Sequence, residues 1–343
     1  MSLIQKRIVG ENTRIPDSKI MMNRKIDNPD GPEDPKSTPK EKTMSKLHSL
    51  SEAIQKYVHD GDVIYAAGFT HMIPFAAAHE IIRQKKKNLT VARATPDLIY
   101  DMLTAAGCVK KVIFSYMGNP GVGSLRIMRD AIEQGEMEWE EYSHFGMISR
   151  LQAGATGLPF MPMNQTGAPS LENANPNIKR ITDPYTGVEV IVVPPLNPDV
   201  AIVHVQRCDK HGNSQIWGIV GEQKEAAFAS KHVIITAEEI VEEDIIRSDP
   251  NRTVIPSIIV DAVCHVPFAA HPSYTQGYYD RDNLFYLAWD EISQSTEKIQ
   301  NWLDEWVYGV KDRDEYWKKL GEDTHNRLKV SPRMSSPIDY GDY

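Results

Sequence analysis

The sequence predicts an α/β fold in which helices flank an open, mostly parallel sheet. Three observations indicate this class. Short apolar runs alternate with amphipathic runs from Leu47 onward, the alternation has the spacing of strand-helix-strand units, and two apolar runs lead into glycine turns, at Gly68 and Gly118. We therefore expect one layered α/β core rather than a helical bundle or a β-sandwich.

The expected elements follow in order along the chain. Asp60-Gly61-Asp62 signals a turn, an apolar strand follows it, Gly68 ends that strand and Pro74 opens the next helix. The first round comprises helix 50–59, strand 63–67, helix 74–84, strand 89–94, helix 97–106 and strand 109–115. The second round comprises helix 123–134, strand 137–142, helix 146–155 and strands 189–193, 200–205 and 233–236.

One domain at residues 44–320 is expected to contain these elements and the helices after them. Residues 1–43 are rich in Pro, Asp, Lys and Asn, which predicts an extended or disordered arm. An apolar run at residues 20–22 leaves open that the arm wraps a partner chain. Residues 321–343 have the composition of a flexible tail. Near-helical spacing over 283–320 predicts C-terminal helices with packing anchors at Trp289, Trp302, Trp306 and Trp317.

Composition limits the function classes. The chain has 343 residues, a formal net charge of −9 and 41% hydrophobic residues, which argues for a globular protein and against nucleic-acid or anionic-membrane binding as its main task. No run reaches the ~20 apolar residues of a membrane span. Cys108, Cys208 and Cys264 lack C-x-x-C spacing, so neither a zinc site nor a disulfide framework is indicated, and we expect a cytoplasmic location.

Two strand ends are expected to form one site. Gly68 permits a backbone with φ > 0 and a close approach to a ligand, and a second apolar strand leads into Ser115, Gly118 and Asn119. In an open parallel sheet, ligands bind outside the carboxyl ends of the strands, so both loops can face one crevice. Taken alone, the Gly68 turn also fits an ordinary connection between a strand and a helix, because no G-x-G-x-x-G motif is present.

The segment from Asp60 to Pro74 resembles the signature of the first subunit of family I CoA-transferases. The Asp-Gly turn, the apolar residues 64–66, Gly68-Phe69 and Pro74 match that signature. Ala67 replaces its first glycine, and the loop is one residue shorter than in the 3-oxoacid branch. In this respect the segment resembles the A subunit of the glutaconate CoA-transferase branch more closely.

The resemblance extends over residues 45–282. Ser115 to Asn119 is similar to a Ser-Tyr-x-Gly-x-Asn turn of the family. Where the 3-oxoacid branch has Thr-Pro-Gln-Gly-Thr before a helix, Phe145 replaces the glutamine and Gly146 is retained, so His144 offers a different polar contact. Further similar segments follow in the family's order, at 135–138, 153–160, 183–187, 198–201 and 209–215.

This resemblance implies the A subunit of an α2β2 heteromer whose B subunit carries the nucleophilic glutamate. No catalytic residue, metal site or cofactor is then expected in this chain, and the CoA thioester binds as a substrate. Glu172, in a Ser-Leu-Glu-Asn string within a Pro/Asn-rich loop, is expected to be a surface residue. The suggested substrate-binding residues are Gly68, Phe69, Thr70, His71, Ser115, Tyr116, Gly118, Asn119, His144 and Gly146.

The expected acceptor is a small carboxylic acid. A dicarboxylate such as glutaconate needs a cation near its second carboxylate, and Arg93, Arg126 and His71 are the candidates. Three alternatives stay open: the A subunit of a related hydrolase that cleaves a carbon-carbon bond in a cyclic CoA ester, a non-catalytic chain that binds acyl-CoA or organises a partner, and a sugar-phosphate isomerase. Asp209 and His211 fit a tight turn better than an acid-base pair.

Overall fold

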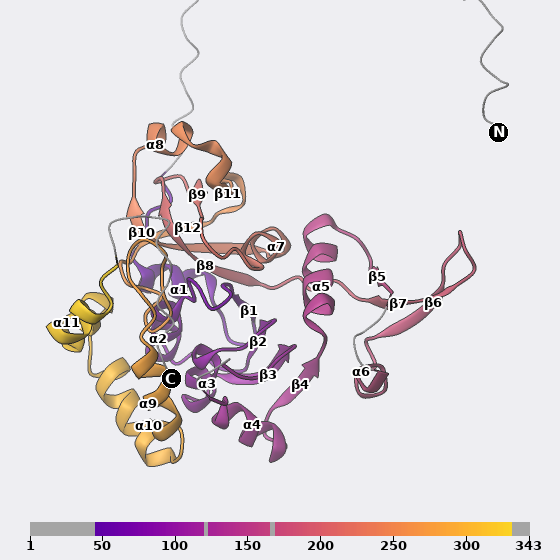
Figure 1. Cartoon of the computed structure of the whole chain (residues 1–343), viewed down its shortest axis with the longest axis horizontal. Helices are drawn as coiled ribbons and strands as arrows, with labels where there is room; N and C mark the ends of the chain where they lie inside the picture. The colour runs from indigo at the N-terminus through magenta and orange to yellow at the C-terminus, as the bar shows by residue number, and fades with distance from the viewer. Residues whose placement is uncertain (1–44, 120–122, 165–168, 331–343) are drawn as a thin grey trace, which may run out of the picture. The chain divides into compact units, whose positions relative to one another are not determined.

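The computed structural model describes residues 45–119, 123–164 and 169–330. The arm expected at 1–43 and the residues after 330 lie outside this part of the chain. Within it, Figure 1 shows a large twisted sheet with helices packed against it, and a smaller sheet that extends away beyond α5. The α/β class predicted from the alternating pattern is therefore confirmed.

The main sheet is mostly parallel, as the sequence predicts. Its strands run in the order β11-β9-β8-β1-β2-β3-β4, and β10 and β12 extend it from β8. The pairs that involve β9 are antiparallel, whereas the others are parallel. The strands are β1 Val63–Ala66, β2 Leu89–Arg93, β3 Val109–Phe114, β4 Glu138–Glu141, β8 Val200–Cys208, β9 Ser214–Gln215, β10 His232–Ile240, β11 Thr253–Ile255 and β12 Ala262–His265.

The helices predicted between the strands are confirmed, most of them with shorter bounds. A capping box starts the first helix, because Ser49 and Glu52 each accept the other's backbone N–H. Ser143 caps the fifth helix through a 3.0 Å bond from the Gly146 N–H, so that helix starts earlier than predicted. The helices up to residue 259 are α1 Leu50–Tyr57, α2 Phe75–Arg83, α3 Leu98–Ala105, α4 Arg126–Glu133, α5 His144–Thr156, α6 Pro169–Ala174, α7 Gln223–Ala229, α8 Glu243–Ser248, and the 3₁₀ turns η1 Pro250–Arg252 and η2 Ser257–Ile259.

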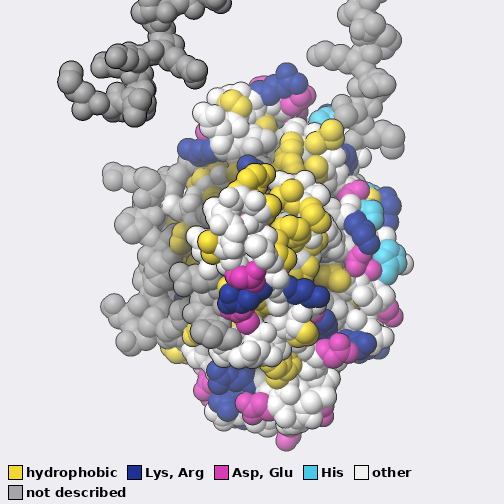
Figure 2. All heavy atoms as spheres, turned by 90° about the vertical axis from the view of Figure 1, so that its right-hand side faces the viewer, with side chains coloured by type: hydrophobic (Ala, Val, Ile, Leu, Met, Phe, Trp, Pro, Cys, Tyr) yellow, Lys and Arg dark blue, Asp and Glu magenta, His cyan; other side chains and the backbone are white. Residues whose placement is uncertain are grey.

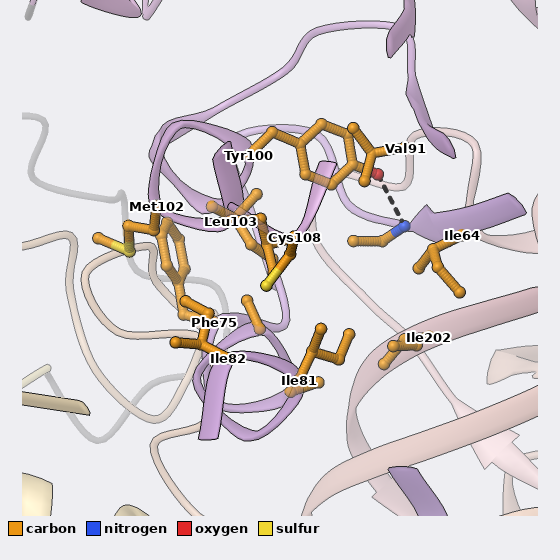
Figure 3. Packing of buried hydrophobic residues seen from close by; sticks show 14 of the residues in the cluster. Ile64, Phe75, Ile81, Ile82, Val91, Tyr100, Met102, Leu103, Cys108 and Ile202 are labelled. Carbon is orange, nitrogen blue, oxygen red and sulfur yellow. Dashed lines mark hydrogen bonds between the residues drawn. The ribbon is translucent and has the colours of Figure 1, made fainter. Parts of the chain in front are cut away.

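Each face of the main sheet has its own hydrophobic core. Ile64 and Ala66 of β1 face α2 and α3, while Tyr65 and Ala67 face the side covered by α5 and α7, because side chains alternate along a strand. Figure 3 shows the first core, where the hydroxyl of Tyr100 accepts a 3.1 Å hydrogen bond from the Ala66 N–H. A helix-borne side chain thus fixes the carboxyl end of β1, directly before the Gly68 loop.

A small antiparallel sheet was not predicted in full. It has the order β5-β7-β6, and the sequence predicted only the strand at 189–193. Pro162 lies within the first strand, and proline in a short run is typical of an edge strand or a loop. The strands are β5 Met161–Met163, β6 Lys179–Thr182 and β7 Glu189–Val193.

The C-terminal helices pack their tryptophans as predicted. Trp289 and Trp302 are buried and meet edge to face, with ring centroids 5.0 Å apart. The tail predicted from residue 321 is wrong for residues up to 330, because Leu328 is buried against Ala270 and Tyr279. The elements are α9 Asn283–Ile292, α10 Thr296–Leu303, the π-helical segment η3 Asp304–Tyr308, α11 Arg313–Leu320 and α12 Glu322–Arg327.

Candidate active site at the carboxyl edge of the sheet

The loop from Gly68 to Met72 is tightly wound. Gly68 has φ 132°, and Thr70 and Met72 both have φ 55°. A Cβ atom at Gly68 would lie 2.7 Å from the carbonyl oxygen of His71 and 2.9 Å from that of Met72. Both the φ angle and this space exclude other residues, so the glycine predicted to shape the loop is required there.

Buried groups hold this loop from behind. Arg93, which is 1% exposed, donates a hydrogen bond to the carbonyl oxygen of Gly68. Ser273 Oγ donates to the carbonyl oxygen of Thr70 at 2.8 Å, and the Met72 N–H donates to the carbonyl of Tyr274 at 2.9 Å. A segment about 200 residues later in the chain therefore sets the conformation of the loop.

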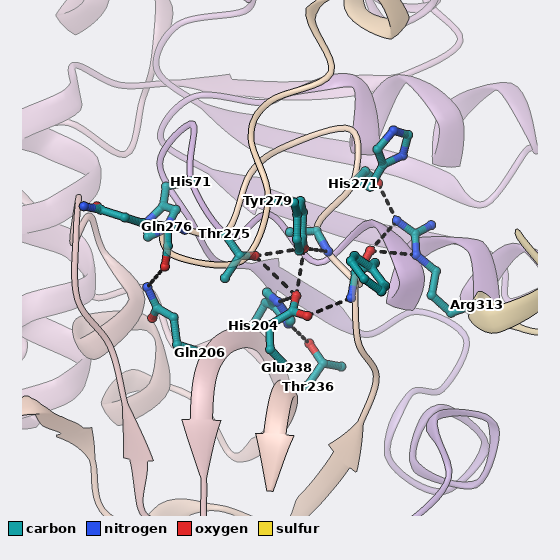
Figure 4. Close-up of polar contacts among 12 residues, drawn as sticks. His71, His204, Gln206, Thr236, Glu238, His271, Thr275, Gln276, Tyr279 and Arg313 are labelled. Atoms are coloured by element: carbon teal, nitrogen blue, oxygen red, sulfur yellow. Dashed lines mark hydrogen bonds and ion pairs between the residues drawn. The ribbon is translucent and has the colours of Figure 1, made fainter. Parts of the chain in front are cut away.

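His71 is buried inside the protein, where the sequence suggested a side chain that faces a substrate. Its side chain is fully buried, with Nδ1 3.0 Å from the carbonyl oxygen of Ile219 and Nε2 2.9 Å from the N–H of Gln276. These partners require a neutral ring that donates from Nδ1, and burial lowers the His71 pKa to about 4. Figure 4 shows His71 beside Gln276, where it joins two loops.

His144 is the centre of a polar cluster at the strand ends. Its Nε2 lies 2.7 Å from Thr95 Oγ1, just after β2, and its Nδ1 lies 2.8 Å from Ser115 Oγ, just after β3. The Phe69 ring meets the imidazole edge to face at 6.4 Å between centroids. The structure thus brings together three predicted residues, Phe69, Ser115 and His144, and adds Thr95, which was not predicted.

A cavity of about 330 Å³ opens beside His144. Partial burial lowers the pKa of His144, so the ring is neutral at pH 7 and can both donate and accept hydrogen bonds. Of the lining residues, only Phe69 and His144 were predicted. The lining residues are Phe69, Ala94, His144, Ile148, Gly221, Glu222 and Glu225.

The residues of the turn after Ser115 contact one another and a nearby glycine. The Tyr116 ring covers Gly118, where a Cβ atom would lie 3.2 Å from it. Asn119 is buried, and its N–H donates to the carbonyl oxygen of Gly123 at 3.0 Å. None of these three residues lines the cavity, so a substrate contact from Tyr116, Gly118 or Asn119 stays a prediction, as it does for Thr70 and Gly146.

The predicted cations do not reach this cavity. Arg126 pairs with Asp290 at 3.2 Å, Arg93 is directed at Gly68, and His71 is engaged on both ring nitrogens. None of the three is a lining residue. These three side chains therefore offer no cation at this cavity, and binding of a second carboxylate by any of them stays a prediction.

The remaining sequence candidates are structural. Asp209 Oδ1 accepts the backbone N–H groups of His211 and Asn213 at 2.9 and 3.0 Å, which confirms the tight turn. Glu172 forms a two-pronged pair with Arg180 at 2.7 and 2.8 Å, in helix α6 rather than in the predicted loop. Across the described residues, no cluster of three or more His, Cys, Asp or Glu side chains is suited to a metal ion. No described helix combines the length and apolarity needed to cross a bilayer.

Comparison with known proteins identifies the family. The coenzyme A transferase family model matches residues 47–265. The chain is 48% identical to the A subunit of the 3-oxoadipate CoA-transferase of Pseudomonas knackmussii, over 81% of its own length and 99% of the relative's. It is 37% identical to the A subunit of the glutaconate CoA-transferase of Acidaminococcus fermentans, over 86% and 98%.

Solved structures agree with this result. The crystal structure of the Acidaminococcus fermentans glutaconate enzyme superimposes with a TM-score of 0.80, covering 86% of this chain and 99% of that one. The decarboxylase AibA/AibB superimposes at 0.65 with 28% identity, covering 76% of this chain and all of that one. The fold and these relatives together define the class, an enzyme subunit that acts on CoA thioesters. This chain belongs to the coenzyme A transferase family, in which it is an A subunit.

Proposed function

We propose that this chain works with a B subunit, in an α2β2 assembly in the cytoplasm, to move CoA between a CoA thioester and a dicarboxylic acid. The relatives support the acid class, because 3-oxoadipate and glutaconate both carry two carboxyl groups. The cytoplasmic location fits the three cysteines, which are buried free thiols. The B subunit brings the nucleophilic glutamate.

The open cavity beside His144 is the observation that carries this proposal. Its lining combines apolar side chains, among them Phe69 of the Gly68 loop, with a neutral imidazole that two hydroxyls hold in place and with two carboxyl groups, a mixture suited to binding and orienting an acyl group. Exposed apolar side chains lie on or within two residues of the cavity residues Phe69, His144 and Gly221 and of Ser115 in the chain, and Figure 2 shows hydrophobic surface gathered on the face that carries α5. A partner that covers this face would exclude water from the reaction. The exposed side chains are Phe69, Tyr116, Phe145, Ile219 and Val220.

The proposed reaction has balanced steps. The partner's glutamate carboxylate attacks the thioester carbonyl carbon and the carbon-sulfur bond breaks. CoA leaves as a thiolate, and an acyl-glutamyl anhydride remains on the enzyme. The thiolate then attacks the glutamyl carbonyl, which releases the first acid as a carboxylate and leaves a glutamyl-CoA thioester. The second acid enters by the reverse steps. Backbone N–H groups near Gly68 stabilise each oxyanion, by about 3 kcal/mol per donor.

Co-expression with the product of the neighbouring reading frame tests this function. We expect the purified complex to exchange CoA between acetyl-CoA and dicarboxylic or 3-oxo acids, and to form an enzyme-CoA thioester that borohydride reduces. Neither chain alone should exchange CoA, because this chain lacks the nucleophile. Consumption of a cyclic CoA ester without an acceptor acid would contradict the transferase and favour the hydrolase, a class that includes a 26% identical IpdA chain of Rhodococcus jostii. Binding of acyl-CoA with no turnover would favour a binding protein without catalysis.

Replacement of Glu172 with Gln is expected to leave turnover unchanged. The Glu172 carboxylate pairs with Arg180 on the surface, and an ion pair that exposed contributes little to stability. The measurement is kcat of the complex for CoA exchange. A loss of turnover without a loss of folded protein would show that this chain supplies the nucleophile after all.

A further inference from the structure

Glu222 is a buried carboxyl group at the wall of the cavity. It directly precedes α7, it is 2% exposed, and it lines the cavity together with Phe69, Ala94 and His144. The wall is close to the Gly68 loop, since a Cβ atom at Gly221 would lie 2.6 Å from Phe69 Cβ. Nothing in the sequence selects this residue, because Glu before a helix is common on protein surfaces.

Tyr65 and Arg93 interact with this carboxyl group but leave one of its oxygens unpaired. It occupies the N-cap position of α7 but makes no side-chain hydrogen bond to the helix. Its Oε1 atom has no hydrogen-bond partner among the described residues, and neither amide atom of its buried neighbour Gln223 has one. Buried polar groups are nearly always paired in folded proteins, so an unpaired carboxyl oxygen on a residue that lines a cavity points to a ligand.

The surroundings favour the neutral form of the carboxyl group. Burial raises the pKa of Glu222, and Glu225 one turn along α7 adds to this effect. Arg93 from β2 and Tyr65 from β1 act in the opposite sense, and His144 from α5 lines the same cavity. A protonated carboxyl donates one hydrogen bond, whereas an ionised one only accepts.

We propose that Glu222 determines specificity by donating a hydrogen bond from its carboxyl group to the second carboxylate of the dicarboxylic acid. This inference rests on the proposed function. It supplies the partner that the second carboxylate otherwise lacks, because Arg93, Arg126 and His71 do not reach the cavity. The volume of about 330 Å³ is at the small end of ligand pockets and suits an acid of a few carbons.

Two variants of Glu222 test the inference in the A/B complex. Glu222→Ala is expected to raise KM for adipate by about 10- to 100-fold, because it removes a buried hydrogen bond to a charged group. The KM for hexanoate, which has the same chain length and no second carboxylate, should change less than about 2-fold. Glu222→Gln keeps a donor at this position and should retain most of the adipate affinity. A variant that raises KM for adipate and leaves KM for hexanoate unchanged is folded, because a loss of folding would affect both acids.

The pH profile gives a second readout. With wild-type protein, KM for adipate should rise as the pH rises, because Glu222 loses the proton it donates and then repels the carboxylate. With Glu222→Gln this rise should disappear, since the amide does not titrate. Glu243→Gln is the matched control, because Glu243 is exposed on α8 and pairs with Arg247, away from the cavity lining. Its profile should equal that of the wild-type protein.

Calorimetric titration of adipate into the complex separates this inference from the proposed function. If no acid accepts CoA but adipate still binds, and Glu222→Ala weakens that binding, the function is wrong and the inference holds. If CoA exchange occurs and both Glu222 variants have the wild-type KM and affinity for adipate, the inference is wrong. It is equally wrong if adipate and shorter dicarboxylates do not bind the wild-type complex, or if hexanoate is affected as strongly as adipate.

Discussion

Gly68→Val is expected to reduce CoA exchange by the complex by about 1,000-fold. Its first side-chain atom would lie 2.7 Å from the carbonyl oxygen of His71, and backbone at a φ of 132° does not tolerate a β-branched residue. The loop has to move, and with it Phe69 and the backbone N–H groups that we propose stabilise the oxyanion. Displacements of about 1 Å at a reacting centre already cost 100-fold in rate.

Gly61→Ala is the matched control for this variant. Gly61 also has a positive φ, 89°, but a Cβ atom there would meet nothing within 4 Å. It should therefore show the cost of backbone strain without a clash, and exchange activity should stay within about 3-fold of wild type. Circular dichroism and assembly with the B subunit check that Gly68→Val folds. Retained activity in a folded Gly68→Val complex would show that the Gly68 loop is not part of the active site.

The elements that the sequence predicted well have local signals. Strands β1 to β4 and helices α2 and α3 follow from the alternation of apolar runs and turns, and the Gly68 loop follows from a glycine that directly ends a strand. Parallel strands place their carboxyl ends at one edge, so Ser115 and His144 could also be expected near Phe69. The 2.8 Å contact between Ser115 and His144 agrees with that expectation.

The features that the sequence did not predict depend on distant residues. His71 is buried because Ile219 and Gln276, about 150 and 200 residues later, use both nitrogens of its ring. Nothing adjacent to His71 signals this. Glu222 likewise became a candidate only through its burial beside Phe69 and Arg93. A glycine on its N-terminal side, at Gly221, was a weak signal of close packing.

The segment after β12 shows how such distant contacts are organised. Glu238 at the end of β10 accepts the Phe268 N–H at 2.8 Å and the Tyr279 hydroxyl at 2.8 Å. Its Oε1 also lies 2.7 Å from Nε2 of His204 on the neighbouring strand (Figure 4). The segment anchored by Glu238 includes Ser273, which holds the Thr70 carbonyl. The buried Glu238 side chain thus supports the Gly68 loop from the opposite side.

Glu238→Ala is accordingly expected to lower the free energy of unfolding by about 3 to 5 kcal/mol, because it leaves His204, Tyr279 and the Phe268 N–H buried without their acceptor. Urea unfolding followed by tryptophan fluorescence measures the change. Glu243→Ala, which removes an exposed partner of Arg247, should cost no more than about 1 kcal/mol. Equal losses in the two variants would mean that the network around Glu238 does not stabilise the fold.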